Sequence, residues 1–321
     1  MDILITIDNR NVMPAGVFMT SVAMNNEPGI TFHILVNEEF LAENRTRLSE
    51  VAAQFGCTVQ FYSISASQQA LFPIGKQGMP GHISISAYNR LFVTEFLPTD
   101  VHRVLYMDPD MIVRKSLDEL WNTNLDGYAL AVVHDMSETG HFAKGRLNYS
   151  SEYGYFNSGL LLINLDYWRE NNCFGRFMDF AREHWDLILL HDQDVLNYVL
   201  HAEKKWLPLT YNFQAGFLFD VPEMIDYPDS WNDEIRSIER DPAIIHYCGW
   251  SKPWNYNCMH PQRYVWHYYK AHSLFRDEKL AKPVSLKEAV VMFLKTNNYW
   301  LFEHHWDSRY RNIYRRVILR K

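Results

Sequence analysis

Val104-Leu105-Tyr106-Met107-Asp108-Pro109-Asp110 combines a buried strand with two acidic residues at its end. Its first four residues are apolar or aromatic without the spacing of an amphipathic helix, a pattern typical of a strand buried on both faces. Pro109 has no N–H to donate to a neighbouring strand, so the strand must end there. Ligands of open α/β sheets bind at the carboxyl ends of the strands. Two carboxylates there favour a divalent cation that binds phosphate, and an acidic turn is the alternative.

The N-terminal part of the chain predicts the sheet to which this strand belongs. Apolar runs favour strands at 3–7, 31–36 and 58–62, with helices at 17–24 and 39–54 between them. This β-α-β-α-β order predicts parallel strands joined by right-handed crossovers, as in a Rossmann-like half. No Gly-x-Gly-x-x-Gly follows the first strand, so the fingerprint of dinucleotide binding is absent.

The rest of the chain continues the alternation of strands and helices. Further strands are expected at 103–107, 128–133, 159–165 and 243–247. Further helices are expected at 86–96, 167–185, 193–201 and 263–273. The segments expected to lie outside both are a Gly- and Pro-rich loop at 72–82, a polar and mobile surface loop at 137–151, and an acidic surface excursion at 225–241. The predicted fold is α/β, with a mostly parallel central sheet flanked by helices.

The composition is that of an ordinary globular protein, with 47% hydrophobic and 21% charged residues among 321. This length accommodates one large domain and an appendage, with a boundary expected near residue 275. A net charge of −7 argues against a general nucleic-acid binder. We therefore expect a domain at 1–275, a separate tail at 276–321 and no nucleic-acid partner.

The charge is distributed unevenly along the chain. Residues 279–321 carry ten Lys or Arg and three acids, a net charge of +7, which leaves −14 for the first 278 residues. The same segment contains aromatic residues such as Tyr299, Trp300 and Trp306. Basic and aromatic side chains together suit an anionic membrane surface. Packing of the tail on its own domain or on a second protomer is the alternative, and the oligomeric state stays open.

The cysteines and the N-terminus indicate the compartment. Cys57, Cys173, Cys248 and Cys258 form no Cys-x-x-Cys pair and no dense framework, as in proteins of a reducing compartment. The sequence contains no basic leader followed by a long apolar run, and no apolar segment long enough to span a bilayer. We expect a cytoplasmic protein, with the tail placing it peripherally at the inner face of the cell membrane.

A second motif lies far downstream, at Ile244-Ile245-His246-Tyr247-Cys248-Gly249-Trp250-Ser251-Lys252-Pro253-Trp254. A short apolar run ends in His246, whose imidazole can complete a metal site with the two acids above. Gly249 allows the backbone to approach a phosphate, and Lys252 supplies a positive charge. A zinc site that combines His246 and Cys248 with the Cys-x-His pair at 258–260 is an alternative, although its spacing matches no common zinc motif.

Together, these two motifs resemble those of glycosyltransferase family 8. This family comprises retaining enzymes of the GT-A fold, including bacterial lipopolysaccharide galactosyl- and glucosyltransferases and glycogenin. The resemblance covers about residues 1–265, and three further motifs follow in the family's order. They are Tyr88-Asn89-Arg90-Leu91 for Y-x-R-L, Tyr155-Phe156-Asn157-Ser158-Gly159 for Y-F-N-[AS]-G, and Asp192-Gln193-Asp194-Val195-Leu196-Asn197 for D-Q-D-x-L-N.

The resemblance implies a role for each matching residue. Asp108, Asp110 and His246 would hold Mn²⁺, or alternatively Mg²⁺, and Asp108 would also contact the substrate. Thr6 and Asp8 would lie near the uracil and ribose of a UDP-sugar, although the run at 8–11, Asp-Asn-Arg-Asn, departs from the family's D-D-N-Y. The remaining implied residues are Arg90, Gly249 and Lys252 near the diphosphate, and Asn157, Asp192 and Gln193 beside the sugar. Among these, Asp192 and Gln193 would lie at the reacting carbon as catalytic residues.

The implied activity is transfer of glucose or galactose from a UDP-hexose to a saccharide or lipid-linked saccharide, with retention of configuration. A self-glucosylating primer similar to glycogenin and a non-catalytic sugar-nucleotide sensor are the alternatives. Asp108-x-Asp110 also occurs in phosphatases similar to haloacid dehalogenases. Their motif follows the first strand and places Thr or Val where this chain has Ile112.

Overall fold

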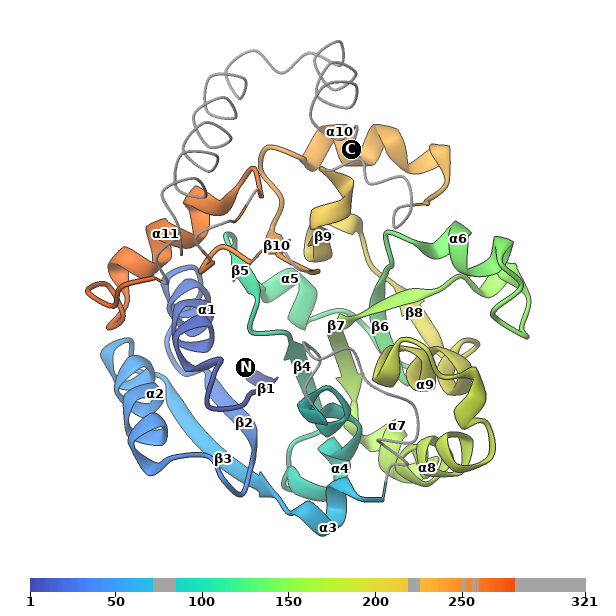
Figure 1. Ribbon diagram of the computed structural model, residues 1–321, viewed down its shortest axis with the longest axis horizontal. Helices are drawn as coiled ribbons and strands as arrows, with labels where there is room; N and C mark the ends of the chain where they lie inside the picture. Colours follow the sequence, from blue (N-terminus) through green and yellow to red (C-terminus); the bar gives the residue numbers. More distant parts are fainter. Residues whose placement is uncertain (72–84, 219–225, 250–251, 256–257, 259, 281–321) are drawn as a thin grey trace, which may run out of the picture.

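The computed structural model describes residues 1–71, 85–218, 226–249, 252–255, 258 and 260–280. The strands of its central sheet are β1 (Asp2–Thr6), β2 (Thr31–Asn37), β3 (Thr58–Ile64), β4 (Arg103–Met107), β6 (Leu130–His134), β7 (Phe156–Asn164) and β8 (Lys204–Trp206). They lie in the order β3-β2-β1-β4-β7-β6-β8 (Figure 1). Only β7 is antiparallel to its neighbours, β4 and β6. The predicted α/β fold with a mostly parallel sheet is therefore confirmed.

Helices cover both faces of this sheet, because its strands alternate apolar side chains between the faces. Ile3 and Ile5 of β1 pack in one core with α1 (Val12–Met24) and α2 (Ala42–Gln54). Leu4 faces a second core formed with the 3₁₀ helix η1 (Ile85–Phe92), α7 (Leu165–Glu170), α8 (Cys173–Glu183) and α9 (His191–Leu200). The shorter helices are α3 (Ala66–Gln69), α4 (Val93–Phe96), α5 (Asp118–Trp121), α6 (Glu138–Ala143) and α10 (Asn232–Ile238).

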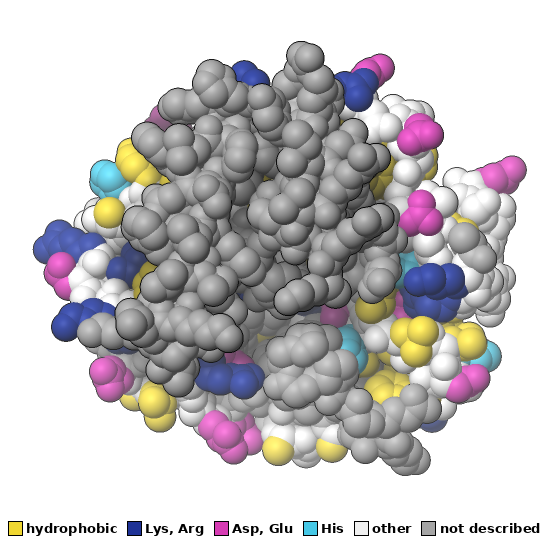
Figure 2. All heavy atoms as spheres, turned by 45° about the horizontal axis from the view of Figure 1, so that its top comes forward, with side chains coloured by type: hydrophobic (Ala, Val, Ile, Leu, Met, Phe, Trp, Pro, Cys, Tyr) yellow, Lys and Arg dark blue, Asp and Glu magenta, His cyan; other side chains and the backbone are white. Residues whose placement is uncertain are grey.

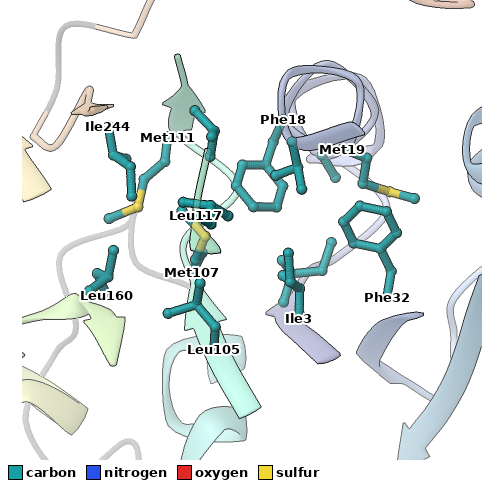
Figure 3. Packing of buried hydrophobic residues seen from close by; sticks show 14 of the residues in the cluster. Ile3, Phe18, Met19, Phe32, Leu105, Met107, Met111, Leu117, Leu160 and Ile244 are labelled. Carbon is teal, nitrogen blue, oxygen red and sulfur yellow. The ribbon is translucent and has the colours of Figure 1, made fainter. Parts of the chain in front are cut away.

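A small second sheet, which the sequence did not predict, continues from the acidic turn. It has the order β5-β10-β9 and consists of β5 (Met111–Val113), β10 (Ile244–His246) and β9 (Phe213–Gln214). Met107 before the turn and Met111 after it both point into the first core, which anchors the turn on both sides (Figure 3). β10 runs antiparallel to β5 with His246 opposite Met111. This register brings the downstream histidine beside the acidic turn.

Two predicted helices have a different form in the structure. The segment 86–96 is mainly the 3₁₀ helix η1 followed by one turn of α4. The helix expected at 167–185 is broken into α7 and α8, because Asn172 adopts a left-handed conformation with φ of 46°. Asn tolerates this region better than most residues, so the chain changes direction there.

The segment 137–151, predicted as a polar, mobile surface loop, is not simply a loop. The segment contains α6, and Glu138 is buried and accepts a hydrogen bond from the Tyr155 backbone N–H at 2.9 Å. Arg146 forms an ion pair with fully buried Asp194 at 2.6 Å. The segment 225–241 is likewise not a simple surface excursion, because it contains α10, whose Ile235 is buried. The loop predicted at 72–82 lies outside the described residues.

The last described element, α11 (Arg263–His272), is followed by residues that pack on the domain. Phe275 is buried against α1, and Glu278 forms an ion pair with Arg47 of α2. Most of the predicted tail, 281–321, lies outside the described residues. None of the helices in the described part of the chain is long and apolar enough to cross a membrane.

Candidate active site

A cavity of about 810 Å³ opens at the edge of the sheet where the acidic turn after β4, the start of β7 and the end of β10 meet. It collects most of the predicted site residues from segments that are far apart in the sequence. They are Arg90, Asp108, Asp110, Asn157, Asp192, Gln193, His246 and Gly249.

Asp108, Asp110 and His246 form a compact group on one wall of the cavity. One ligand atom from each lies within 4.8 Å of the others. His246 Nε2 is 3.3 Å from Asp110 Oδ1 and 3.9 Å from Asp108 Oδ2. Asp110 Oδ1 is buried and has no hydrogen-bond partner among the described residues. Burial disfavours the charged form of Asp110, but Lys252 and His246 together outweigh this effect and hold its pKa below the ordinary value. Two carboxylates and an imidazole fit a divalent metal, and the unpartnered oxygen supports this fit.

Gly159 makes room for this group. β7 pairs with β4 so that Met107 lies opposite Leu160, and the Asp108 backbone N–H donates to the Gly159 carbonyl oxygen at 2.8 Å. A Cβ atom on Gly159 would lie 2.5 Å from His246 Cε1 and 2.9 Å from Asp108 Oδ2. Any side chain at this position would therefore force the carboxylate and the imidazole apart.

Arg90 links the acidic turn to α9. Its buried guanidinium lies 3.0 Å from Asp108 Oδ1 and 3.1 Å from Asp192 Oδ2, and it donates to the Ser158 carbonyl oxygen at 2.5 Å. It also stacks over Tyr106, whose hydroxyl donates to Asp108 at 2.6 Å. Burial lowers the pKa of Arg90, but the surrounding carboxylates, chiefly Asp108 and Asp192, together with Tyr106 outweigh burial and raise the pKa above its ordinary value. The guanidinium therefore stays charged and aligns both acids toward the cavity.

Asp192 has a pKa that predicts a pH-dependent stability. Burial raises the pKa of Asp192 from 3.8 to about 6. The positive charge of Arg90 opposes this increase, and the negative charge of Asp108 adds to it. Because the pKa of Asp192 is higher in the folded state than in the unfolded state, its protonated form stabilises the fold. This stabilisation is complete below pH ~4 and is lost as the pH rises through ~6. Asp192→Asn has no such titration. We expect its free energy of unfolding, relative to wild type, to rise by up to about 3 kcal/mol between pH ~4 and ~7.5.

Urea unfolding at a series of pH values checks this expectation. Asp226→Asn is the matched control, because Asp226 is an exposed acid on the wall of the same cavity and should follow the wild-type profile. Parallel profiles for Asp192→Asn and wild type would contradict the raised pKa.

The start of α9 is fixed by residues other than Asp192. Asp194, rather than Asp192, accepts the backbone N–H groups of Leu189 and Leu190, both at 2.7 Å. Asn197 exchanges two hydrogen bonds with the Phe156 backbone in β7, at 2.8 and 2.9 Å. These contacts leave Asp192 and Gln193 on the cavity side of the first turn.

Asp135 is a site residue that the sequence reasoning missed. It is buried, lines the cavity and accepts hydrogen bonds from Asn157 Nδ2 at 3.1 Å and Gln193 Nε2 at 3.2 Å. It directly follows β6, so the rule that located Asp108 at the end of its strand would also have found it. The cavity is also lined by Ser137, Gly140, His141, Lys144 and Asp226, which lie on or beside the segment predicted as a mobile loop.

Three predicted residues lie outside the lining of this cavity. Lys252 contacts it indirectly, through an ion pair with Asp110. The Thr6 hydroxyl is hydrogen-bonded to the Tyr106 hydroxyl at 3.1 Å, and the Tyr106 hydroxyl in turn donates to Asp108. Asp8 lies beyond the end of β1 and binds Arg10 at 2.8 Å.

The group that the zinc alternative requires does not form in the described part of the chain. There, the one set of three or more possible metal ligands is Asp108, Asp110 and His246. His260 is buried instead beside Tyr247, with ring centroids 4.5 Å apart, and its Nδ1 accepts the Gln262 backbone N–H at 3.1 Å. His260 therefore takes part in the packing of the fold and not in a group of metal ligands in the described part of the chain.

The mostly parallel sheet and the cavity with its group of possible metal ligands are typical of transferases of the GT-A class, and comparisons with known proteins agree with this class. The sequence model of Glycosyl transferase family 8 matches residues 2–258. General stress protein A of Bacillus subtilis is 26% identical over 272 residues, which cover 83% of this chain and 91% of that protein. Lipopolysaccharide 1,2-glucosyltransferase of Escherichia coli is 24% identical over 307 residues, with coverage of 94% and 86%.

A solved structure of a glycosyltransferase also resembles this chain. The galactosyltransferase LgtC, crystallised with donor and acceptor sugar analogs, superposes with a TM-score of 0.75 at 27% identity, over 88% of this chain and 98% of that one. The chain belongs to glycosyl transferase family 8. The resemblance predicted from the sequence motifs is confirmed, and the phosphatase alternative is excluded.

Proposed function

We propose that the protein transfers glucose or galactose from a UDP-hexose to a saccharide or lipid-linked saccharide, with retention of configuration. The observation that carries this proposal is the cavity that joins the Asp108, Asp110 and His246 group to the buried polar residues around Gln193. A lipopolysaccharide glucosyltransferase and a galactosyltransferase are both among the similar proteins, so both hexoses are proposed as donors.

In this proposal, Asp108, Asp110 and His246 hold Mn²⁺, with Mg²⁺ as the alternative. When bound, the metal acts as a Lewis acid and stabilises the charge that develops on the diphosphate of UDP. Gly249, with a φ of 80°, offers its backbone N–H to the same diphosphate, and Lys252 offers its ammonium. Thr6 and Asp8 then lie toward the nucleoside at the end of β1.

At the sugar end, Arg90, Asn157, Asp192 and Gln193 position the hexose. Gln193 Oε1 already accepts hydrogen bonds from the Ser158 backbone N–H at 2.9 Å and from Asn157 Nδ2 at 3.2 Å. These two donors occupy the lone pairs that an attack on the sugar would need, which disfavours a covalent intermediate on Gln193. We therefore favour attack by the acceptor hydroxyl on the face from which UDP leaves. The bond from C1 to the phosphate oxygen breaks, a bond from C1 to the acceptor oxygen forms, and the hydroxyl proton passes to the leaving phosphate.

Assays with UDP-glucose and UDP-galactose test the proposal. Purified protein with Mn²⁺ is incubated with each donor, with and without lipid-linked saccharides, and both UDP release and the anomeric configuration of the product are measured. We expect acceptor-dependent release and a product with the configuration of the donor. Inverted product would contradict the retaining mechanism. Binding without UDP release would support a sensor, and hexose attached to the protein itself would support a self-glucosylating primer.

Lys252 should affect metal binding and nucleotide binding in opposite directions. Its ammonium forms an ion pair with Asp110, a proposed metal ligand, and donates to the Tyr247 carbonyl oxygen at 2.8 Å. Removing the charge in Lys252→Met should raise Mn²⁺ affinity roughly tenfold without nucleotide and lower UDP affinity roughly tenfold, within the few kcal/mol that adjacent charges exchange near a surface. Calorimetric titration measures both constants. Lys205→Met, which removes a half-buried charge at β8 that donates to the Asn124 carbonyl oxygen, should change neither. A loss of Mn²⁺ affinity in Lys252→Met would refute the expectation.

For the C-terminal segment, we propose association with an anionic membrane surface, peripheral and cytoplasmic. The contacts of Phe275 and Glu278 support a tail that starts after residue 280 rather than at 276. On the face shown in Figure 2, basic and acidic side chains of the described residues are interspersed, and the excess of positive charge in the sequence is at the C-terminus.

Deletion of 281–321 tests this proposal, because it removes nine Lys or Arg and three acids. Each basic residue near an anionic surface contributes about 1 kcal/mol. We expect the full chain to co-sediment with phosphatidylserine vesicles at low salt and to be released by high salt, and the deleted chain to stay in solution. Equal binding of both chains would indicate that the tail packs on the domain or on a second protomer.

A further inference from the structure

Asn212 contacts two residues that line the cavity, although it is not itself among the cavity-lining residues. It closes the short helix η4 (Leu209–Asn212) immediately before β9 and is fully buried. Its side-chain oxygen lies 2.8 Å from His246 Nδ1. Its side-chain nitrogen lies 2.9 Å from Asn157 Oδ1. One amide therefore contacts both a residue of the metal-binding group and a residue of the sugar end.

The backbone N–H of Gly159 fixes the direction of each hydrogen bond in the series that runs from Gly159 through Asn157 and Asn212 to His246. The Gly159 N–H donates to Asn157 Oδ1 at 3.0 Å, and a backbone N–H can only donate. The Asn157 atom is therefore the oxygen, and the Asn212 atom that faces it must be the NH₂ group. The oxygen of Asn212 then faces His246 Nδ1. Because that oxygen only accepts, Nδ1 must carry a hydrogen.

The direction of the hydrogen bond between His246 and Asn212 determines whether the other ring nitrogen, Nε2, faces Asp108 and Asp110 with a lone pair or with a hydrogen. A neutral imidazole that donates from Nδ1 has its lone pair on Nε2. Nε2 faces Asp110 Oδ1, which has no hydrogen-bond partner among the described residues, at 3.3 Å. Acceptor atoms that face each other without a proton between them are stabilised by a cation. At the other end, the same amide holds Asn157 so that its Nδ2 points to Asp135 and Gln193.

We propose that Asn212 is a positioning residue that fixes His246 in the tautomer able to bind a metal and orients Asn157 at the same time. The inference rests on the metal-binding part of the proposed function. Second-shell partners of this kind typically change metal affinity by about 10- to 100-fold when they are removed. No other polar side chain of the described residues is bonded to His246 Nδ1, so Asn212 carries this effect alone.

The tautomer can be measured in the unmodified protein without metal or sugar. Long-range ¹H–¹⁵N correlation spectra of protein with ¹⁵N-labelled histidine separate the two tautomers, and loss of a signal in His246→Ala assigns it. We expect the hydrogen on Nδ1. A hydrogen on Nε2 with none on Nδ1 would overturn the proposal. This readout is independent of sugar transfer, so the proposed function can fail while the inference holds, and the reverse.

Two variants of nearly equal size separate positioning from packing. Asn212→Leu keeps the number and branching of the side-chain heavy atoms but accepts no hydrogen bond, and we expect its Mn²⁺ affinity to fall about 10- to 100-fold. Asn212→Asp still accepts from His246 Nδ1, and we expect its Mn²⁺ affinity to stay within about threefold of wild type. Manganese binding is followed by electron paramagnetic resonance, with folding checked by circular dichroism. Wild-type affinity in Asn212→Leu, or equal losses in both variants, would overturn the proposal.

A control completes the experiment. Asn164→Ala removes a partly buried amide at the opposite end of β7, where it accepts the Tyr167 backbone N–H at 3.0 Å. It should lower stability without changing Mn²⁺ affinity. A loss of metal affinity in Asn164→Ala would show that the effect follows general destabilisation, and the proposal would be withdrawn.

Discussion

Asp110→Asn is expected to reduce hexosyl transfer about 10³-fold and to abolish the metal dependence of UDP binding. The substitution keeps the shape of the side chain but removes a negative charge from a group of three ligands within 4.8 Å of each other. It also leaves Lys252 without its ion-pair partner. A Lewis-acid metal supplies several kcal/mol of transition-state stabilisation, which corresponds to this loss of rate.

The measurement pairs initial rates of transfer with UDP titrations in the presence and absence of Mn²⁺. In wild type, Mn²⁺ should tighten UDP binding, and in Asp110→Asn the two titrations should coincide. Asp226→Asn is the control, because it removes an exposed acid from the lining of the same cavity and is not part of the Asp108, Asp110 and His246 group. Near-normal turnover of Asp110→Asn at ordinary Mn²⁺ concentrations would remove this residue from the metal site.

Sequence patterns predicted the central sheet well, because buried parallel strands are continuous apolar runs that end in polar residues. The strand before Asp108 was predicted at 103–107 and observed with the same bounds. The helices were predicted less accurately, since tertiary contacts decide where a helix ends. Asn172, which breaks the helix expected at 167–185, is one of several polar residues in that stretch, and the sequence does not mark it.

The grouping of Asp108, Asp110 and His246 was predictable because each of these residues lies at the end of a strand. Asp108 and Asp110 follow β4, and His246 is the last residue of β10. The short strands that bring them together were not predictable, because β5 has three residues and β9 only two. Segments this short carry no periodicity, so the pairing of β5 with β10 depends on the fold around them.

Residues that act through other residues left no signal in the sequence. Asn212 matters because its amide lies between His246 and Asn157, which are far from it along the chain. Arg146 was placed in a mobile loop because its neighbours are polar, although its partner Asp194 is fully buried. The local pattern of polar residues cannot show that a charge is neutralised by a distant partner.

His246→Ala should reduce transfer almost as strongly as Asp110→Asn, whereas His260→Ala should reduce it less than about threefold, because only His246 offers a ligand atom to the proposed metal. The two histidines are a matched pair, since both side chains are buried to the same degree, with 2% exposed. Burial holds the pKa of His260 at about 3, so its imidazole is neutral at working pH. Its ring packs on Tyr247 and accepts the Gln262 backbone N–H.

Stability and activity should therefore separate between the two variants. His260→Ala leaves a buried backbone N–H without its acceptor, which costs about 1–3 kcal/mol in the free energy of unfolding. His246→Ala removes an imidazole from a wall of the cavity, so its loss of Mn²⁺ affinity and of transfer should exceed its loss of stability. Transfer rates, Mn²⁺ titration and urea unfolding of both variants provide the comparison. Equal losses of activity, together with stoichiometric zinc in the purified wild type, would instead favour a site built from both histidines and the neighbouring cysteines.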